Sequence, residues 1–386
     1  MVIRDIEIFD RDSEHIATVD EAKVSFKLLN LSGDGLGAID EINITGAHVD
    51  LKKRDDDTWN FNDIKIESEG ESNFGAKITL DEGSLDATFD DKNISVEEIA
   101  AEADCADLNA VDTKISAKTL GSHIDATGTL GAENQLIFAN VDSVDVEKVL
   151  PYLPEGILPE SLELRGGTIE KPKLQISRRG EILKYLGSAD LKNGAVKIED
   201  TEIDNINGSA TFDNSEVVFN ASAQANGQSA KASGIIHTDT DEVFFDIHAN
   251  GENFYPAAII GNLGIEGAAN FDAHLIGTAE NPQVEADISS DYLAYENLSA
   301  RNVKTKLRYN GAEVFLSDIN AETFGGKLSG EATIKTEDLA YDAHVKATGI
   351  EVAQLKNFAN VAADVDGKIS GDVAISGVGQ VLESLQ

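Results

Sequence analysis

The sequence predicts an all-β fold made of a repetitive antiparallel sheet, with few helices. The first observation is alternation: apolar residues occupy every second position over most of the 386 residues, as at Val284, Ala286 and Ile288. Period two is typical of a strand with one apolar and one solvated face. The second is Asn310-Gly311, which lies between two such runs and indicates a hairpin turn. The third is an internal repeat.

The repeat relates the segment beginning at Ala189 to the segment beginning at Ala286. Phe212 then corresponds to Tyr309, Val217 to Val314 and Phe219 to Leu316. Further on, the offset slips by one residue, so that Asp246 and His248 correspond to Asp342 and His344. A more distant echo joins 121–128, 227–234 and 325–330, each ending in glycine. Repeated all-β units favour a solenoid-like or extended sheet over a compact enzyme.

Taken in order, the chain divides into four parts. Residues 1–142 alternate as strands, and residues 143–160 interrupt the alternation with three of the six prolines. Within this break, Ser143 is expected to cap a short helix that Pro151 ends. Residues 161–276 and 277–386 are two β repeat units, the second truncated at its C-terminal end. Further short helices are expected at Phe254 to Ile260 and Val352 to Phe358.

Composition narrows the classes of partner. Asp and Glu number 70 against 31 Lys and Arg, giving a formal net charge of −39. Such a chain repels phosphate backbones and anionic membrane surfaces, so no nucleic-acid partner is expected. The single cysteine, Cys105, forms no intramolecular disulfide and no thiolate-rich metal site. No run of 18 apolar residues is found, which indicates either a cytoplasmic protein or a piece separated from its membrane anchor.

Motifs for catalysis are not found. The sequence has no phosphate-binding loop, dinucleotide fingerprint, nucleophile elbow or zinc-binding helix motif. Asp246 and His248 share a strand face, as do Asp342 and His344, and an inherited surface pair is favoured over a metal ligand or general base. We therefore expect no enzyme activity, no catalytic residue, no cofactor and no metal.

Three stretches carry a resemblance to a known family. They are Ile6 to Asp10, Ile42 to Leu51, and Asp57-Thr-Trp-Asn-Phe61. The units at 187–236 and 277–334 add the cadence "Ile-Asp-Asn-Ile-Asn-Gly" and the opening Gly277…Pro282-Gln-Val. Together they resemble AsmA-like repeat proteins, in particular the TamB family, whose name refers to a translocation and assembly module.

The resemblance implies an elongated sheet curled into an open groove, a β-taco. It implies a periplasmic protein of a diderm bacterium, anchored in the inner membrane, that conducts phospholipids to the outer membrane and supports outer-membrane biogenesis, protein assembly and secretion. The implied partners are phospholipid acyl chains and an Omp85-type outer-membrane protein. The N-terminal anchor and the C-terminal part that meets this partner are missing here, so we expect a fragment of a longer protein.

Physical reasoning agrees with a groove. A sheet of roughly 25 strands must cover its apolar side with a second sheet or with lipid, because the expected helices are too few. The runner-up is a structural or surface β-solenoid, such as an adhesin stalk, with a filled interior; a third interpretation is an enzyme on a β-helix scaffold. The candidate groove residues are bulky apolar side chains of the repeats: Phe212, Val217, Phe219, Val303, Leu307, Tyr309, Val314 and Leu316.

Overall fold

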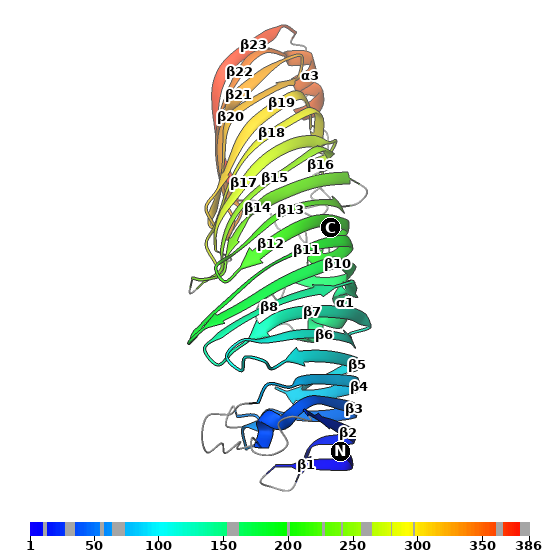
Figure 1. Cartoon of the computed structure of the whole chain (residues 1–386). Coiled ribbons are helices and arrows are strands. Elements are labelled where there is room, and N and C mark those ends of the chain that lie inside the picture. Colours follow the sequence, from blue (N-terminus) through cyan, green and yellow to red (C-terminus); the bar gives the residue numbers. More distant parts are fainter. Residues whose placement is uncertain are drawn as a thin grey trace. The chain divides into compact units, whose positions relative to one another are not determined.

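The computed structural model confirms an all-β chain, and the residues that it describes form 23 strands, assigned by their pairing to one open sheet (Figure 1). The chain packs as two compact units, each described separately below. Unit 1 comprises Met1–Leu158, Gly166–Lys192 and Thr211–Asn214, and unit 2 comprises Pro159–Arg165, Asn193–Ala210 and Ser215–Gln386. The structure describes residues 1–10, 14–27, 35–54, 58–63, 74–152, 162–198, 201–225, 228–240, 242–255, 265–278, 280–295, 298–359 and 366–378.

Unit 1 is built from strands that follow one another along the chain. They are β1 (Val2–Phe9), β2 (His15–Phe26), β3 (Ile39–Lys52), β4 (Lys77–Phe89), β5 (Lys92–Asp104), β6 (Val111–Thr119), β7 (Ser122–Leu130), β8 (Asn134–Val141) and β9 (Ser143–Asp145). Strands β10 (Leu162–Arg179), β11 (Ile182–Ile198) and β12 (Thr201–Asp213) each have residues in both units.

One strand pair of unit 1 departs from the antiparallel pattern. The β3–β4 pair is parallel, while its neighbours β2–β3 and β4–β5 are antiparallel as expected. A parallel pair needs a crossover connection of about a dozen residues or more, because the chain must return to the end of the sheet where the first strand began. The connection from Lys52 to Lys77 is long enough for this return, whereas a hairpin turn would have reversed the strand.

Unit 2 continues with antiparallel pairs. Its strands are β13 (Glu216–Ala225), β14 (Gln228–His237), β15 (Phe244–Phe254), β16 (Ile265–Glu266), β17 (Ala269–Thr278), β18 (Pro282–Tyr295), β19 (Leu298–Tyr309), β20 (Glu313–Thr323), β21 (Gly326–Lys335), β22 (Ala340–Glu351) and β23 (Lys368–Val378). Each long strand from β13 onward pairs with the next, and the two-residue β16 pairs with β18. Figure 1 shows the long strands of this unit strongly bent along their length.

Helices are short in the described parts of the chain. They are α1 (Val146–Val149), α3 (Val352–Ala359) and the 3-10 turns η1 (Gly35–Ala38), η2 (Asn60–Asp63) and η3 (Leu150–Tyr152). The helix expected at Val352 is confirmed, whereas most of the one expected at Phe254 to Ile260 lies outside the described residues. None of the described helices combines the length and apolarity that a membrane span requires.

Two local expectations are corrected. Asp145, not Ser143, is the N-cap residue of α1, because Ser143 is held in β9 opposite Glu170. The α-helix ends at Val149, before Pro151 as expected, and the 3-10 turn η3 follows it. Pro151 is accommodated because a proline in the first turn of a helix lacks no required hydrogen bond. At Asn310-Gly311 the hairpin is confirmed, but only Gly311 has a positive φ, since Asn310 Oδ1 accepts hydrogen bonds from the N–H groups of Ala312 and Glu313.

The glycine echo has a structural basis. Gly128, Gly234 and Gly330 occupy equivalent places on β7, β14 and β21, where the next strand approaches closely. A Cβ added at these positions would meet the Cα of Ile137 at 3.0 Å, of Ile247 at 2.8 Å and of Val345 at 3.0 Å, and would overlap a neighbouring carbonyl oxygen. The repeat therefore encodes a close approach between strands that only glycine permits.

The four-part division expected from the sequence stays a prediction. The two compact units reflect packing, and residues of β10, β11 and β12 belong to one unit or the other according to their neighbours in space.

Candidate functional site

The two faces of unit 2 follow directly from strand register. Residues that lie directly opposite one another on successive strands share a face, and side chains alternate along each strand. We call each such line of opposed residues a row. Two neighbouring rows cross the ten strands β13, β14, β15 and β17–β23, and together they define the apolar face of unit 2.

The first of these rows, the bulky row, carries large apolar side chains interrupted by two glycines. It runs Phe219, Gly234, Ile247, Leu275, Val284, Tyr309, Val314, Ile334, Tyr341 and Gly377. No charged residue interrupts it.

The second row, which we call the alanine row, lies two residues away from the bulky row on each strand. It runs Ala221, Ala232, Ala249, Ala273, Ala286, Leu307, Leu316, Ala332, Ala343 and Ile375. On β13, β14, β15, β17, β18, β21 and β22 the small side chains leave the backbone close to whatever covers this face.

The opposite face is polar. The row between the two described above reads Asn220, Ser233, His248, His274, Glu285, Arg308, Phe315, Thr333, Asp342 and Ser376. From Pro282 to Ile288 and from Val303 to Tyr309 the exposure alternates residue by residue, and every charged side chain in these stretches is exposed. Arg308 and Glu285 form an exposed ion pair at 3.2 Å. This face accounts for solubility.

The apolar face does not form a sealed core. Among the described residues, no large side chain is less than 2 % exposed, and nearly all members of the bulky row are half-buried. The most buried aromatic side chain is Phe254, which is 4 % exposed and packs with Ile203, Ala230 and Phe271 at one end of the strands. Its ring meets that of Phe271 edge-on at 5.6 Å. Side chains from β12, β14, β15 and β17 thus converge, which shows that the bent sheet partly covers its own apolar face.

The sequence-predicted groove residues are mostly brought together. Phe219, Tyr309 and Val314 lie in the bulky row, Leu307 and Leu316 lie in the alanine row, and Val217 and Val303 lie on the same face. Phe212 belongs to unit 1. Its ring occupies the space that a Cβ on Gly187 would need. Repeat-related residues do not share a row: Phe219 is level with Val314 and not with Leu316, because the register across the intervening strands shifts the repeat by two residues.

Several members of the face were missed by sequence reasoning. The alanines of the alanine row were passed over in favour of bulky residues, although Ala221, Ala232, Ala249 and Ala273 each stand between polar neighbours. That spacing of small apolar residues is the signal that could have found them.

Unit 1 repeats the same arrangement on its own strands. An apolar row crosses it through Ile3, Ala22, Ile44, Leu80, Ala101, Ile115, Ala126, Ala139 and Leu174. Leu136 and Phe138 are apolar, so alternation alone would assign them to the buried face. They lie instead on the face of unit 1 opposite this row, and both are exposed.

A hollow of about 710 Å³ lies at mid-strand in unit 2. Its lining combines charged residues such as Asp272, Asp287 and Lys306 with Phe271 and Ile288. A lining this polar does not favour an apolar small molecule, so the extended apolar face is the better candidate site.

Comparison with known proteins agrees with this architecture. The model of the AsmA family matches residues 188–386, just over half of the chain, and the chain belongs to the AsmA family. No curated protein and no solved structure matches significantly.

Proposed function

We propose that this chain is part of an envelope protein that conducts phospholipids along the apolar face of its sheet. Membership of the AsmA family, whose proteins are envelope-associated, supports the proposal. The observation that carries it is the pair of apolar rows, free of charged residues, that crosses ten strands of unit 2 and is half-buried but not sealed. Contact between this apolar face and water is unfavourable. Each lipid CH₂ that moves from water onto the face is stabilised by about 0.8 kcal/mol.

The dimensions suit acyl chains. Ten strands at about 4.8 Å spacing give a row of roughly 43 Å, and one leaflet of a bilayer's hydrocarbon core is about 15 Å thick. Several successive positions along the row can therefore hold a chain of that length. With a net charge of −39, the protein attracts no anionic headgroup, so binding depends on the acyl chains and leaves headgroups in water.

The filled solenoid is disfavoured by the same burial. A filled interior requires large apolar side chains that are fully buried, and none is found in the described ranges. An adhesin-like stalk would also gain nothing from a continuous half-exposed apolar row, which exposes it to aggregation.

The finer proposal follows from the resemblance to TamB. In it the parent protein is anchored in the inner membrane, crosses the periplasm, and works with an Omp85-type outer-membrane protein in outer-membrane biogenesis and protein assembly. The long β units and the AsmA match support it. Co-purification of the intact parent with an Omp85-type protein from crosslinked envelopes tests it; a parent found only in the cytosol contradicts it.

The lipid proposal is tested by photo-crosslinking in cells. A photoreactive residue at Phe219 or Val314, both in the bulky row, is expected to yield phospholipid adducts. The control is Phe315, which is adjacent to Val314 and also half-buried and apolar, but lies on the polar face. Equal labelling from 315, or no lipid adducts from 219 and 314, would contradict the proposal.

Aspartate variants distinguish an open lipid path from the filled core of a solenoid. Phe219→Asp and Val314→Asp are expected to melt within a few degrees of the parent protein, because the new carboxylate can reach water beside a half-buried row, while lipid passage stops. If the interior is filled instead, the same variants lose several kcal/mol and unfold. Collapse of both variants together with an absence of adducts would favour the solenoid.

A further inference from the structure

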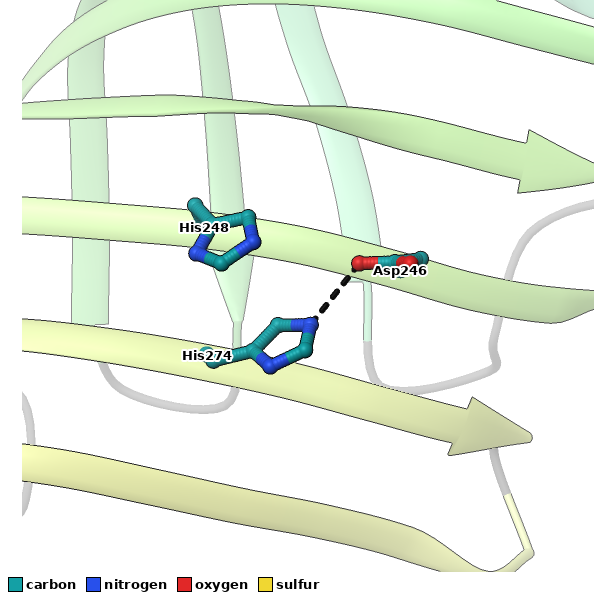
Figure 2. A group of neighbouring side chains, drawn as sticks. All are labelled: Asp246, His248 and His274. Atoms are coloured by element: carbon teal, nitrogen blue, oxygen red, sulfur yellow. Dashed lines mark hydrogen bonds and ion pairs between the residues drawn. The ribbon is translucent and has the colours of Figure 1, made fainter.

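A cluster of three potential metal ligands lies on the polar face of unit 2. Asp246 and His248 lie two residues apart on β15, and His274 lies directly opposite His248 on β17 (Figure 2). The two imidazole rings are stacked, with centroids 4.1 Å apart and planes inclined by only 4°. His274 Nε2 is 2.8 Å from Asp246 Oδ1. One donor atom from each of the three residues lies within 4.8 Å of the other two.

We propose that Asp246, His248 and His274 bind a zinc-class divalent transition-metal ion that links β15 to β17. Two imidazoles and one carboxylate are a donor set suited to Zn²⁺, and imidazole donors disfavour Mg²⁺ and Ca²⁺. Ligands of one zinc ion lie about 2.0–2.2 Å from it, so the most widely separated donors must move closer together, while His274 Nε2 and Asp246 Oδ1, which are 2.8 Å apart, must separate slightly. Because the stacked rings are nearly parallel, their nitrogen lone pairs do not converge, and at least one ring must turn about its terminal torsion to face the ion. That torsion is soft and these side chains are partly exposed, so the fold leaves room for the turn.

The surroundings favour a cation. Glu285 lies directly opposite His274 on β18, and Asp272 lies two residues before His274 on the same face. In the described part of the chain, neither ring nitrogen of His248 has a hydrogen-bond partner, so that ring is available for coordination. The hydrogen bond between His274 Nε2 and Asp246 Oδ1 already places these two donors side by side, and a bound ion would take the place of the shared proton.

Other histidines in the chain are less suited. His48 lies near Asp50 and Asp86, but its Nδ1 is 2.9 Å from Ser84 Oγ, and the group offers a single imidazole. His344 pairs with Asp342 at 3.2 Å, which gives two donors. The sequence places Asp246 beside His248 in the same way; only the β15–β17 register adds His274.

The test measures Zn²⁺ affinity of the full chain by competition with a chromophoric chelator. A His48→Gln background removes the second group of potential ligands. One equivalent of Zn²⁺ is expected, and His248→Ala or His274→Ala should weaken its affinity at least tenfold. Co²⁺ is expected to give the visible absorption of a tetrahedral site in the background protein and to lose it in both variants. His344→Ala, a matched exposed histidine beside an aspartate, is the control and should change neither result.

Hydrogen exchange provides a readout at the strands themselves. Zn²⁺ should slow amide exchange in β15 and β17 of the background protein and have no such effect in His274→Ala. The proposal is overturned if no Zn²⁺ binds at micromolar concentration. It is equally overturned if His274→Ala and His344→Ala reduce the affinity alike, since that result indicates non-specific binding to scattered histidines.

Discussion

The backbone N–H of Asn253 donates a hydrogen bond of 2.8 Å to the side-chain Oδ1 of Asn270 on the neighbouring strand. Asn253 has a φ of 53° and lies where the β15–β17 register shifts. The same arrangement recurs between Asn193 and Asn207 at 3.1 Å. It recurs again between Gly349, whose φ is 67°, and Ser370 Oγ at 2.9 Å. A bulge thus leaves one N–H out of the ladder, and a polar side chain of the next strand accepts it.

Loss of this acceptor should weaken the bulge. Asn270→Ala is expected to destabilise unit 2 by about 1 kcal/mol, because the N–H of Asn253 loses its partner. Asn253→Gly should be close to neutral, since glycine adopts a positive φ without strain but costs entropy in the unfolded chain. Hydrogen exchange of the β15 and β17 amides measures both. Equal protection in Asn270→Ala and the parent protein would show that the bond contributes nothing.

The close approach at glycine should be intolerant of a side chain. Gly234→Ala and Gly330→Ala are each expected to cost more than about 2 kcal/mol, because the new methyl group would overlap the adjoining strand. Gly371→Ala is the control: its Cβ would meet no atom within 4 Å, and we expect no loss of stability. The urea concentrations at the unfolding midpoints of the three variants test this expectation. A Gly234→Ala midpoint equal to that of Gly371→Ala would disprove the close approach.

Cys105 should react slowly with thiol reagents. Burial raises the pKa of its thiol above the ordinary value of 9.0, and the negative charge of Asp104 raises the pKa further. Since the thiolate is the nucleophile, labelling at pH 8 is expected to be far slower in the folded protein than in urea. Asp104→Asn should speed the reaction only modestly, because burial is the larger cause. Labelling of the folded chain as fast as in urea would contradict this environment.

The same thiol makes a small contribution to the pH dependence of stability. Its pKa is higher in the folded chain than in the unfolded chain, so the folded chain holds the proton more tightly. The contribution is fully present below the unfolded pKa and is lost as pH rises through the folded pKa. Cys105→Ala should flatten this part of the curve. Identical curves for both proteins between about pH 8 and 10 would refute it.

Nucleic-acid binding should not be detectable. With a net charge of −39, the chain as a whole repels a phosphate backbone, most strongly at low salt. A gel-shift experiment with micromolar protein and random duplex DNA is expected to show free DNA only. A retarded band that weakens as salt is added would count against this expectation.

Much of the fold is readable from the sequence because alternation specifies which side chains share a face. The residues of β18 and β19, the hairpin at Gly311 and helix α3 follow from local pattern alone. The parallel β3–β4 pair does not, because strand direction depends on the path of the connection between them.

The candidate site was predicted less completely than the fold. Alternation placed Val217, Phe219 and Val314 on a common type of face, but which residues are level depends on registers that bulges change by one or two residues. For the same reason the sequence could pair Asp246 with His248, but could not bring His274, which lies on another strand, beside them.

The two apolar rows also determine the energy profile for any apolar cargo. Because every strand contributes uncharged apolar side chains or glycine to the two rows, a hydrocarbon chain meets no charged group as it passes from one strand to the next. The free energy along the rows therefore has no barrier from a charged side chain, and the row members do not change steadily in size from one end to the other. A path of this kind lowers the barrier in both directions equally, and net movement along it must come from unequal chemical potentials at its two ends.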